Sequence, residues 1–287
     1  MESLTQTILL YDVNNPFEYY QAYTLNTLDD KTREKYRQIF FEYQSCFINT
    51  KKGDFENALV HLENGNIWFH QACKELQDFV TVFCMPFTSY YYYKCKDFKN
   101  AILKTEFIID QIIELEHKGY AYLFFSRIQQ QQNIARIFWA TREIEKALAI
   151  YSECVINIYT KASNWKDSQL IQDIPLSTIA EDTQYQFFLQ VFIETLNYIF
   201  KTFSKDRVLV AHYIRIFLKP IDTLQLRQIK LEDKYASFYD FVYLFQLFVD
   251  RDDKGFTDAA LEFLDMQEFD VELKKTICRY LYHFNYV

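Results

Sequence analysis

Four polar residues near the middle of the chain have the types and spacing of a hydrogen-bonding surface. Spacings of three, four and seven positions would place all of them on one face of a helix. Amide and guanidinium groups on such a face can bind backbone carbonyls or a carboxylate. We expect this face to be exposed and to bind a peptide; the alternative is an ordinary solvated face. The residues are Gln129, Gln132, Asn133 and Arg136.

A second polar run, residues 250–258, partly matches the calcium-binding loop of an EF-hand. Asp and Gly stand at several of the positions that such a loop uses. Lys254 and Leu261 replace two of its ligands, including the final bidentate Glu. This run is therefore interpreted as a charged turn between helices, and we expect neither a metal nor another cofactor.

No pattern in the chain nominates the reacting groups of an enzyme. Glycine-rich phosphate loops and the Gly-x-Ser-x-Gly elbow are both missing from the sequence. His61 and His70 are nine positions apart, whereas helical zinc ligands are spaced by three or four. His117 stands near an expected helix end, where an imidazolium suits the helix dipole. We expect a protein without enzymatic activity, and catalysis on the same fold is the least favoured of the alternatives.

Cysteine usage indicates a reducing compartment. The six cysteines include no pair separated by only two residues, so the sequence does not suggest a zinc knuckle or a redox pair. Each stands in an apolar stretch, and we expect buried free thiols.

A run of four tyrosines, residues 90–93, is a further candidate contact surface. Four consecutive residues sweep around a helix, so all four cannot be buried. We expect one or two of them to pack beneath the Asp97–Phe98 turn. The others either line a groove or are ordinary exposed aromatics.

Composition indicates that helices position these residues. Hydrophobic residues make up 50% of the 287 residues and aromatic residues 19%, which is enough for a sizeable core. Only four Gly and four Pro are present. Sandwiches and barrels need many turns that draw on these two residues. The sequence therefore predicts an all-α fold.

One short pattern recurs along the first half of the chain. Residues 53–59 read Gly-Asp-Phe-Glu-Asn-Ala-Leu, and residues 96–102 read Lys-Asp-Phe-Lys-Asn-Ala-Ile. Residues 142–148, Arg-Glu-Ile-Glu-Lys-Ala-Leu, form a third copy. A polar turn, a large apolar residue and then an alanine suit the second helix of a hairpin. The alanine lets the partner helix approach closely.

These runs resemble the tetratricopeptide repeat (TPR), which has Gly-Asp-Tyr-x-x-Ala at the same turn. Tyr92 and Phe138 match the family's aromatic position before the alanine, and Gly65 and Cys154 its small position after it. The period exceeds the family's 34 residues, which implies longer helices. The resemblance covers residues 33–160. It implies an α-α superhelix of TPR-like hairpins whose first helices line a concave, peptide-binding surface.

The rest of the chain divides around that repeated region. Residues 1–32 are expected to form an N-terminal helical segment. From residue 161 the rhythm changes, and residues 161–182 are interpreted as an insertion or hinge. Residues 183–287 are expected to form helical hairpins that continue the superhelix.

Local signals predict several helix boundaries. Asp29 or Asp30 can cap a helix, and Asp206 can start another that ends at Pro220. Thr178 and Glu181 have the spacing of a capping box, which would open a long helix. Residues 254–259 are read as a fainter copy of the hairpin turn.

Charge and hydropathy narrow the expected partners. The formal net charge is −8, from 31 basic and 39 acidic residues, and no basic stripe is present. A chain of this kind repels phosphate backbones, so nucleic-acid binding is not expected. No secretory signal or apolar stretch of membrane-spanning length is apparent, so we expect a cytoplasmic location without membrane contact. Oligomeric state is not determined by the sequence.

The favoured hypothesis is a protein- or peptide-binding module, either scaffold or adaptor, that uses a concave helical groove. The alternative is a ligand-sensing domain, similar to those of bacterial peptide-pheromone receptors. Such receptors usually carry an N-terminal helix-turn-helix domain. Residues 1–50 show neither its turn glycine nor a basic recognition helix.

Overall fold

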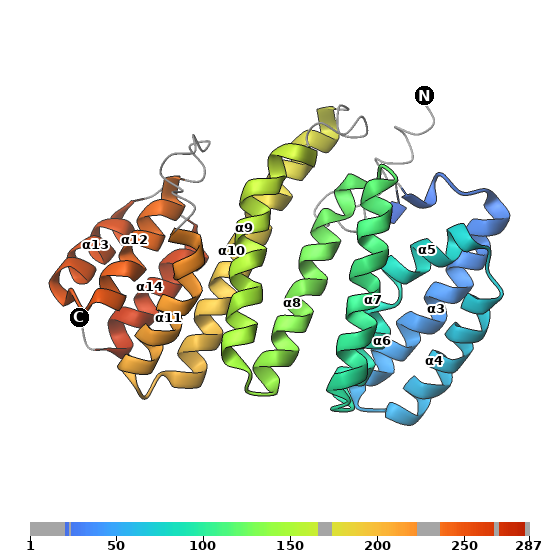
Figure 1. The fold of residues 1–287 in the computed structure, drawn as a ribbon, viewed down its shortest axis with the longest axis horizontal. Coiled ribbons are helices and arrows are strands. Elements are labelled where there is room, and N and C mark those ends of the chain that lie inside the picture. The colour runs from blue at the N-terminus through green and yellow to red at the C-terminus, as the bar shows by residue number, and fades with distance from the viewer. Residues whose placement is uncertain (1–20, 23, 166–173, 223–235, 267–269, 285–287) are drawn as a thin grey trace. The chain divides into compact units, whose positions relative to one another are not determined.

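The computed structural model is described for residues 21, 22, 24–165, 174–222, 236–266 and 270–284. Within these ranges all regular structure is helical, with twelve α-helices, one short 3-10 helix and no strand (Figure 1). The predicted all-α class is therefore confirmed. Residues 1–20 of the predicted N-terminal helical segment, like residues 166–173 of the predicted hinge, lie outside the described residues.

The chain divides into two compact units. The first unit comprises residues 1–141 and 163–183, and the second comprises residues 142–162 and 184–287. The first seven helical elements are α3 (Asp30–Lys52), α4 (Phe55–His70), α5 (Lys74–Phe83), α6 (Pro86–Lys94), α7 (Phe98–His117), η1 (Ala121–Leu123) and α8 (Phe124–Ala140). The remaining six are α9 (Ile144–Trp165), α10 (Ile174–Phe203), α11 (Arg207–Asp222), α12 (Ala236–Asp250), α13 (Asp253–Asp265) and α14 (Val271–His283). The predicted domain boundaries remain predictions.

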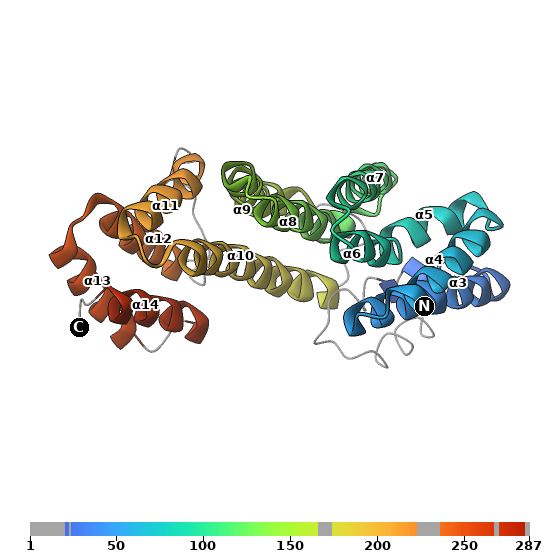
Figure 2. The ribbon, with the colours of Figure 1, turned by 90° about the horizontal axis from the view of Figure 1, so that it is seen from below.

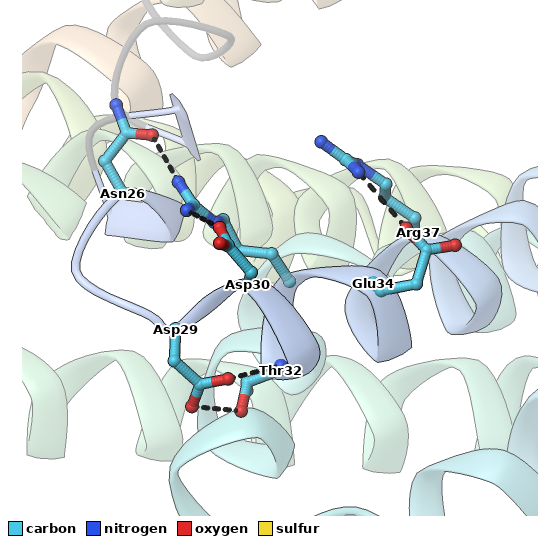
Figure 3. A network of polar contacts seen from close by, with 7 residues as sticks. Asn26, Asp29, Asp30, Thr32, Glu34 and Arg37 are labelled. Atoms are coloured by element: carbon cyan, nitrogen blue, oxygen red, sulfur yellow. Dashed lines mark hydrogen bonds and ion pairs between the residues drawn. The ribbon is translucent and has the colours of Figure 1, made fainter.

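Hydrogen bonds at its N-terminus set where α3 begins. The carboxylate of Asp29 accepts from the backbone N–H of Thr32 at 2.9 Å and from its hydroxyl at 2.8 Å (Figure 3). Asp29, and not Asp30, is therefore the capping residue. Asp30 lies in the first turn and pairs with Arg33. One turn later, Arg37 pairs with Glu34 at 3.1 Å, so the exposed start of the helix is bordered by local ion pairs.

A left-handed residue ends the preceding helix at each repeated turn. The φ angles are 80° at Gly53, 61° at Lys96, 69° at Arg142 and 61° at Arg251. At three of these turns the next residue is an aspartate, whose N–H donates to the carbonyl five residues back at 2.9–3.1 Å. This bond satisfies a carbonyl that the helix end leaves without a partner.

The same aspartates start the following helices. The carboxylates of Asp54, Asp97 and Asp252 accept from the backbone amide three residues further on, at 3.2, 3.2 and 2.9 Å. Each turn therefore ends one helix and caps the next within two residues. Residues 250–258, interpreted from the sequence as a charged turn between helices, contain one of these turns at Arg251 and Asp252.

Alanines at the predicted close-approach positions are fully buried. Ala58, Ala101 and Ala147 each have no exposed surface. Gly65 is similarly constrained, because a Cβ added there would lie 3.0 Å from the Tyr43 ring. The tyrosine hydroxyl donates to Asn66 at 2.9 Å, so α3 and α4 are in close contact along this line.

Two sequence-based boundaries are wrong. The turn expected at residues 254–259 lies at Arg251 and Asp252, which places Gly255 within the first turn of α13. The capping aspartate decides this position, because its carboxylate binds the Gly255 amide. In α10, Thr178 lies inside the helix and does not open it, since α10 begins at Ile174. Pro in the first turn is compatible with that start.

The start predicted for α11 is confirmed, but its predicted end is not. The carboxylate of Asp206 accepts from the N–H groups of Val208 and Leu209 at 2.9 and 3.1 Å. At the other end, Pro220 lies within the last turn and the helix continues to Asp222. Proline stops a helix less sharply in the last turn than in the middle, because few backbone bonds remain to be lost.

The core of the second unit is aromatic. Rings from α10, α11, α12, α13 and α14 meet there, and neighbouring ring centroids lie 4.9–5.8 Å apart. These fully buried residues are Phe192, Phe217, Phe241, Phe245, Phe248, Phe256 and Tyr280. The high phenylalanine content of the chain is thus used, in part, to join five helices around one core.

We predict that substitutions at two equivalent turn positions change stability in opposite directions. Gly53→Ala should lower the free energy of unfolding by about 0.5–1 kcal/mol, because alanine is strained at positive φ. Lys96→Gly should raise it by a similar amount, about 0.5 kcal/mol, because it removes that strain. Urea unfolding measures both. If both variants shift the midpoint in the same direction, the left-handed conformation does not control these turns.

We predict that Ala101→Arg destabilises the protein far more than Lys99→Ala. A long charged side chain between packed helices should cost at least about 3 kcal/mol in strain and desolvation. Lys99 is exposed, so its truncation should change stability by less than about 0.5 kcal/mol. Equal unfolding midpoints for the two variants would contradict the assigned packing.

Candidate functional site

The polar face predicted on α8 is more enclosed than expected. Gln129, Asn133 and Arg136 are half-buried, and Gln132 has no exposed surface. The expectation of an exposed face is therefore wrong, because side chains packed around α8 cover much of it. The predicted role of these residues in binding a peptide remains a prediction.

Side chains on this face bind one another. The guanidinium of Arg136 donates to the Asn133 side-chain oxygen at 2.8 Å, and the Asn133 amide donates to Gln130 at 3.1 Å. In contrast, neither amide atom of Gln132 has a hydrogen-bond partner among the described residues. Leaving a buried polar group unsatisfied costs about 1–3 kcal/mol, so Gln132 is an unusual residue for a helix interface.

A bidentate ion pair fixes the first half of α8. The Arg127 guanidinium donates to the two carboxylate oxygens of Glu116 at 2.8 and 3.1 Å, which ties α8 to the end of α7. The same guanidinium lies 5.0 Å from the Phe124 ring centroid. Arg127 is 8% exposed, so this cation is committed to the fold and is not available to a ligand.

A groove in the second unit is a better-formed candidate. It has a volume of about 510 Å³ and lies between α10 and the start of α14. Sequence reasoning did not identify it. Its lining residues are Gln186, Leu189, Gln190, Ile193, Glu194, Asn197, Tyr198, Lys201, Asp270 and Glu272.

The two faces of α10 explain how this groove arises. One face is apolar and buried, and it includes Phe188, Phe192 and Leu196, with at most 2% exposure each. Polar residues follow one another on another face, at spacings of four, four, three and four. They are Gln186, Gln190, Glu194, Asn197 and Lys201. The spacing rule that selected the α8 residues would have found this row as well.

Contacts between α10 and α14 hold one side of the groove. The Tyr280 hydroxyl donates to the Leu196 carbonyl at 3.2 Å, and the Tyr280 ring packs 5.0 Å from that of Phe200. Arg279 donates to the Asn197 side chain. Figure 2 shows α10 and α14 within the second unit. These hydrogen bonds and ring contacts together hold α14 beside the polar row.

The groove has ends of opposite charge. His283, at the end of α14, contacts the carbonyl of Ser204 at 2.9 Å, just beyond the end of α10, whereas Tyr280 binds Leu196 earlier in α10. The two helices therefore run in the same direction. Asp270 and Glu272, at the start of α14, therefore lie toward the Gln186 end of the row. Lys201 lies at the other end.

The acidic end is partly occupied by local contacts. Asp270 caps α14 by accepting from the Glu272 amide at 2.7 Å, and Glu272 pairs with Lys275 at 2.6 Å. Each carboxylate retains a second oxygen that can accept from a ligand.

Other candidate groups serve the fold. Burial raises the pKa of Cys84 to about 12 and that of Cys46 to about 11, so both are poor nucleophiles at neutral pH. The expectation that all six cysteines are buried is wrong, since Cys73, Cys95 and Cys278 are exposed. In the described part of the chain, no three His, Cys, Asp or Glu side chains are grouped to hold a metal ion.

The tyrosine run behaves partly as expected. Tyr91 is buried, and burial raises its pKa to about 12. Tyr93 packs against Phe98 at the turn, with 6.0 Å between ring centroids. Tyr90 contacts Phe47 on α3 at 5.0 Å and is half-buried. The run therefore contributes mainly to packing between α3, α6 and α7.

Comparisons with protein-family models, curated protein sequences and solved structures find no significant match to this chain. Across the described residues, no helix combines the length and hydropathy needed to span a bilayer.

We predict that Tyr280→Phe lowers the free energy of unfolding by about 1 kcal/mol, because it removes the buried hydrogen bond to Leu196. Tyr282 on the same helix is 83% exposed, so Tyr282→Phe is the matched control and should change stability little. Urea unfolding of both variants decides between them. A Tyr280→Phe protein as stable as the control would mean that this hydroxyl does not anchor α14.

Proposed function

We propose that this chain is a non-enzymatic protein- or peptide-binding module, and that the groove between α10 and α14 is its binding site. The groove itself carries this proposal, because it joins a row of amide and charged side chains to an apolar floor. Its volume of about 510 Å³ is within the range of known ligand sites, roughly 300–1,000 Å³.

The spacing of the polar row suits an extended peptide. Residues four apart on a helix are separated by about 6 Å along its axis. Residues two apart on an extended chain repeat every 6.6–6.8 Å, roughly the same interval. Gln186, Gln190 and Glu194 could therefore meet successive backbone groups on one edge of a peptide. Glutamine amides both donate and accept, which matches the alternation of N–H and C=O groups.

The length of the row sets the size of the ligand. From Gln186 to Lys201 the helix rises about 22 Å, which corresponds to roughly six or seven extended residues. Ile193 and Tyr198 supply apolar contacts between the polar groups, while Leu189 forms part of the buried floor. A ligand of this length could contact both charged ends of the groove.

As part of the same proposal, we infer that the hairpins are TPR-like, and the repeated turn supports this. A left-handed residue, a capping aspartate and a buried alanine recur at Gly53–Ala58 and Lys96–Ala101. The arrangement of such hairpins into a continuous superhelix with a concave surface remains proposed. The alternative function, a ligand-sensing domain, would use the same groove. It differs from a scaffold or adaptor only in the process that peptide binding controls.

We predict that two glutamines of the groove determine peptide affinity. Linear heptapeptides displayed on phage and selected on the full-length protein provide the probes. The double variant Gln186→Ala, Gln190→Ala should bind the selected peptides at least tenfold more weakly, because backbone hydrogen bonds are lost. Fluorescence anisotropy measures the affinities. Both glutamines are exposed, so the double variant should have nearly the same melting temperature as the parent protein.

Two controls locate the binding surface. Gln38→Ala, an exposed glutamine in the middle of α3, should leave every affinity unchanged. Arg136→Glu should also leave it unchanged, and a loss of binding there would assign the site to the α8 face instead. Failure to select any peptide, or undiminished binding by the double variant, would refute the groove as the binding site.

A further inference from the structure

One helix of the first unit, α4, has apolar side chains on two faces. Its inner face packs against α3 through Ala58, Leu62 and Gly65. Ala58 and Leu62 are at most 3% exposed, and Gly65 is buried. Its outer face also carries large apolar residues, among them Val60 at 54%, Ile67 at 56% and Trp68 at 46% exposure. A helix that is apolar on both sides normally has packing partners on both.

The outer residues form two adjacent ridges, each with a spacing of four. The first ridge is Phe55, Leu59, Glu63 and Ile67, and the second is Glu56, Val60, Asn64 and Trp68. Seven of these eight side chains are exposed and Asn64 is half-buried. Such ridges enclose a shallow groove that accepts a ridge of another helix, at an interaxial distance of roughly 8–10 Å. The geometry is thus that of a helix–helix interface with one helix missing.

Charge on this surface is negative. Glu56 and Glu63 stand among the apolar residues, and neither forms an ion pair with a described cation. Glu42 and His61, at the α3 side, are hydrogen-bonded to each other at 2.7 Å. A helix seated in the groove would therefore bring its flanking residues close to two uncompensated carboxylates.

We propose that the outer face of α4 binds an amphipathic helix of a partner protein, with lysine or arginine beside its apolar stripe. The apolar stripe fills the groove between the two ridges, and the basic residues pair with Glu56 and Glu63. This surface lies on α4 in the first unit, so it is separate from the peptide groove of the second unit and does not depend on it.

Charge also argues against two other occupants. Residues 1–20 of this chain carry Glu2, Asp12 and Glu18 and contain no Lys or Arg. A second copy of α4 would bring its own Glu56 and Glu63 to the same interface. Like charges at a contact disfavour both arrangements, whereas a basic helix is attracted.

A pair of designed peptides tests the proposal on the full-length protein. Each is an 18-residue, fluorescein-labelled helix with Leu at positions i, i+3, i+4 and i+7, flanked in one by Lys and in the other by Glu. Fluorescence anisotropy should show the Lys peptide binding at least tenfold more tightly than the Glu peptide. Raising the salt concentration should reduce this difference, because the pairing is electrostatic.

Substitutions then place the peptide on α4. Val60→Asp with Ile67→Asp should weaken binding of the Lys peptide at least tenfold without lowering the melting temperature. Val208→Asp, at an exposed valine of α11, is the matched control and should have no effect. Glu56→Lys with Glu63→Lys should reverse the preference between the two peptides, because both carboxylates are replaced by cations.

Three results would overturn the proposal: no binding of the Lys peptide, equal binding of both peptides, or unchanged binding by the α4 double variant. Sedimentation of the protein alone tests for a second copy. A dimer that the double variant converts to a monomer would assign the surface to self-association instead.

Discussion

The tight reversal made by a left-handed residue and a capping aspartate is the constraint on which both candidate surfaces depend. At Gly53–Asp54 it turns the chain from α3 into α4, and at Arg251–Asp252 from α12 into α13. Only two residues separate the helices, so the direction of each second helix is fixed by backbone hydrogen bonds. The outer face of α4 follows from the first turn. The placement of α14, which α13 precedes, follows in part from the second.

Packing of aromatic rings completes what the turns begin. Tyr280 of α14 lies within 5.4 Å, centroid to centroid, of Phe245 and Phe248 on α12, and it also bonds to α10 through its hydroxyl. One side chain thus joins three helices of the second unit. Burial of the ring supplies the hydrophobic term, while the hydroxyl sets the register of α14 along α10. That register brings Asp270 and Glu272 to the polar row of α10.

Both proposed surfaces are made of side chains that lie outside the buried core of their unit. The apolar face of α10 is used by the core, whereas Gln186 and Gln190 of its polar row are exposed. The inner face of α4 is used by α3, so its outer apolar ridges are likewise surplus to the hairpin. The chemistry differs: amides and charges suit an extended backbone, whereas apolar ridges suit another helix. The two proposed surfaces accordingly call for different ligands.

Local interactions explain what the sequence could predict. Helical class, the turns at Gly53 and Lys96, the Asp206 cap and the close-approach alanines all depend on residues within a few positions of one another. The misplaced turn also has a local cause. Asp252 accepts from the Gly255 amide, so the turn lies at Arg251 and Asp252 and not around Gly255. The row on α10 was also readable, since its spacing is visible along a single helix.

Only the tertiary structure decided which faces are covered. Periodicity shows that α4 has a second apolar face, but its exposure depends on whether any other helix packs there. The prediction for Gln132 was wrong for the same reason. Its polarity predicted exposure to solvent, but in the folded chain the side chain is fully buried. The groove joins residues 186–201 to residues 270–272, which are brought together by packing around Tyr280. Contacts between residues so distant in sequence leave no periodic signal, because burial is a property of the assembled surface and not of one segment.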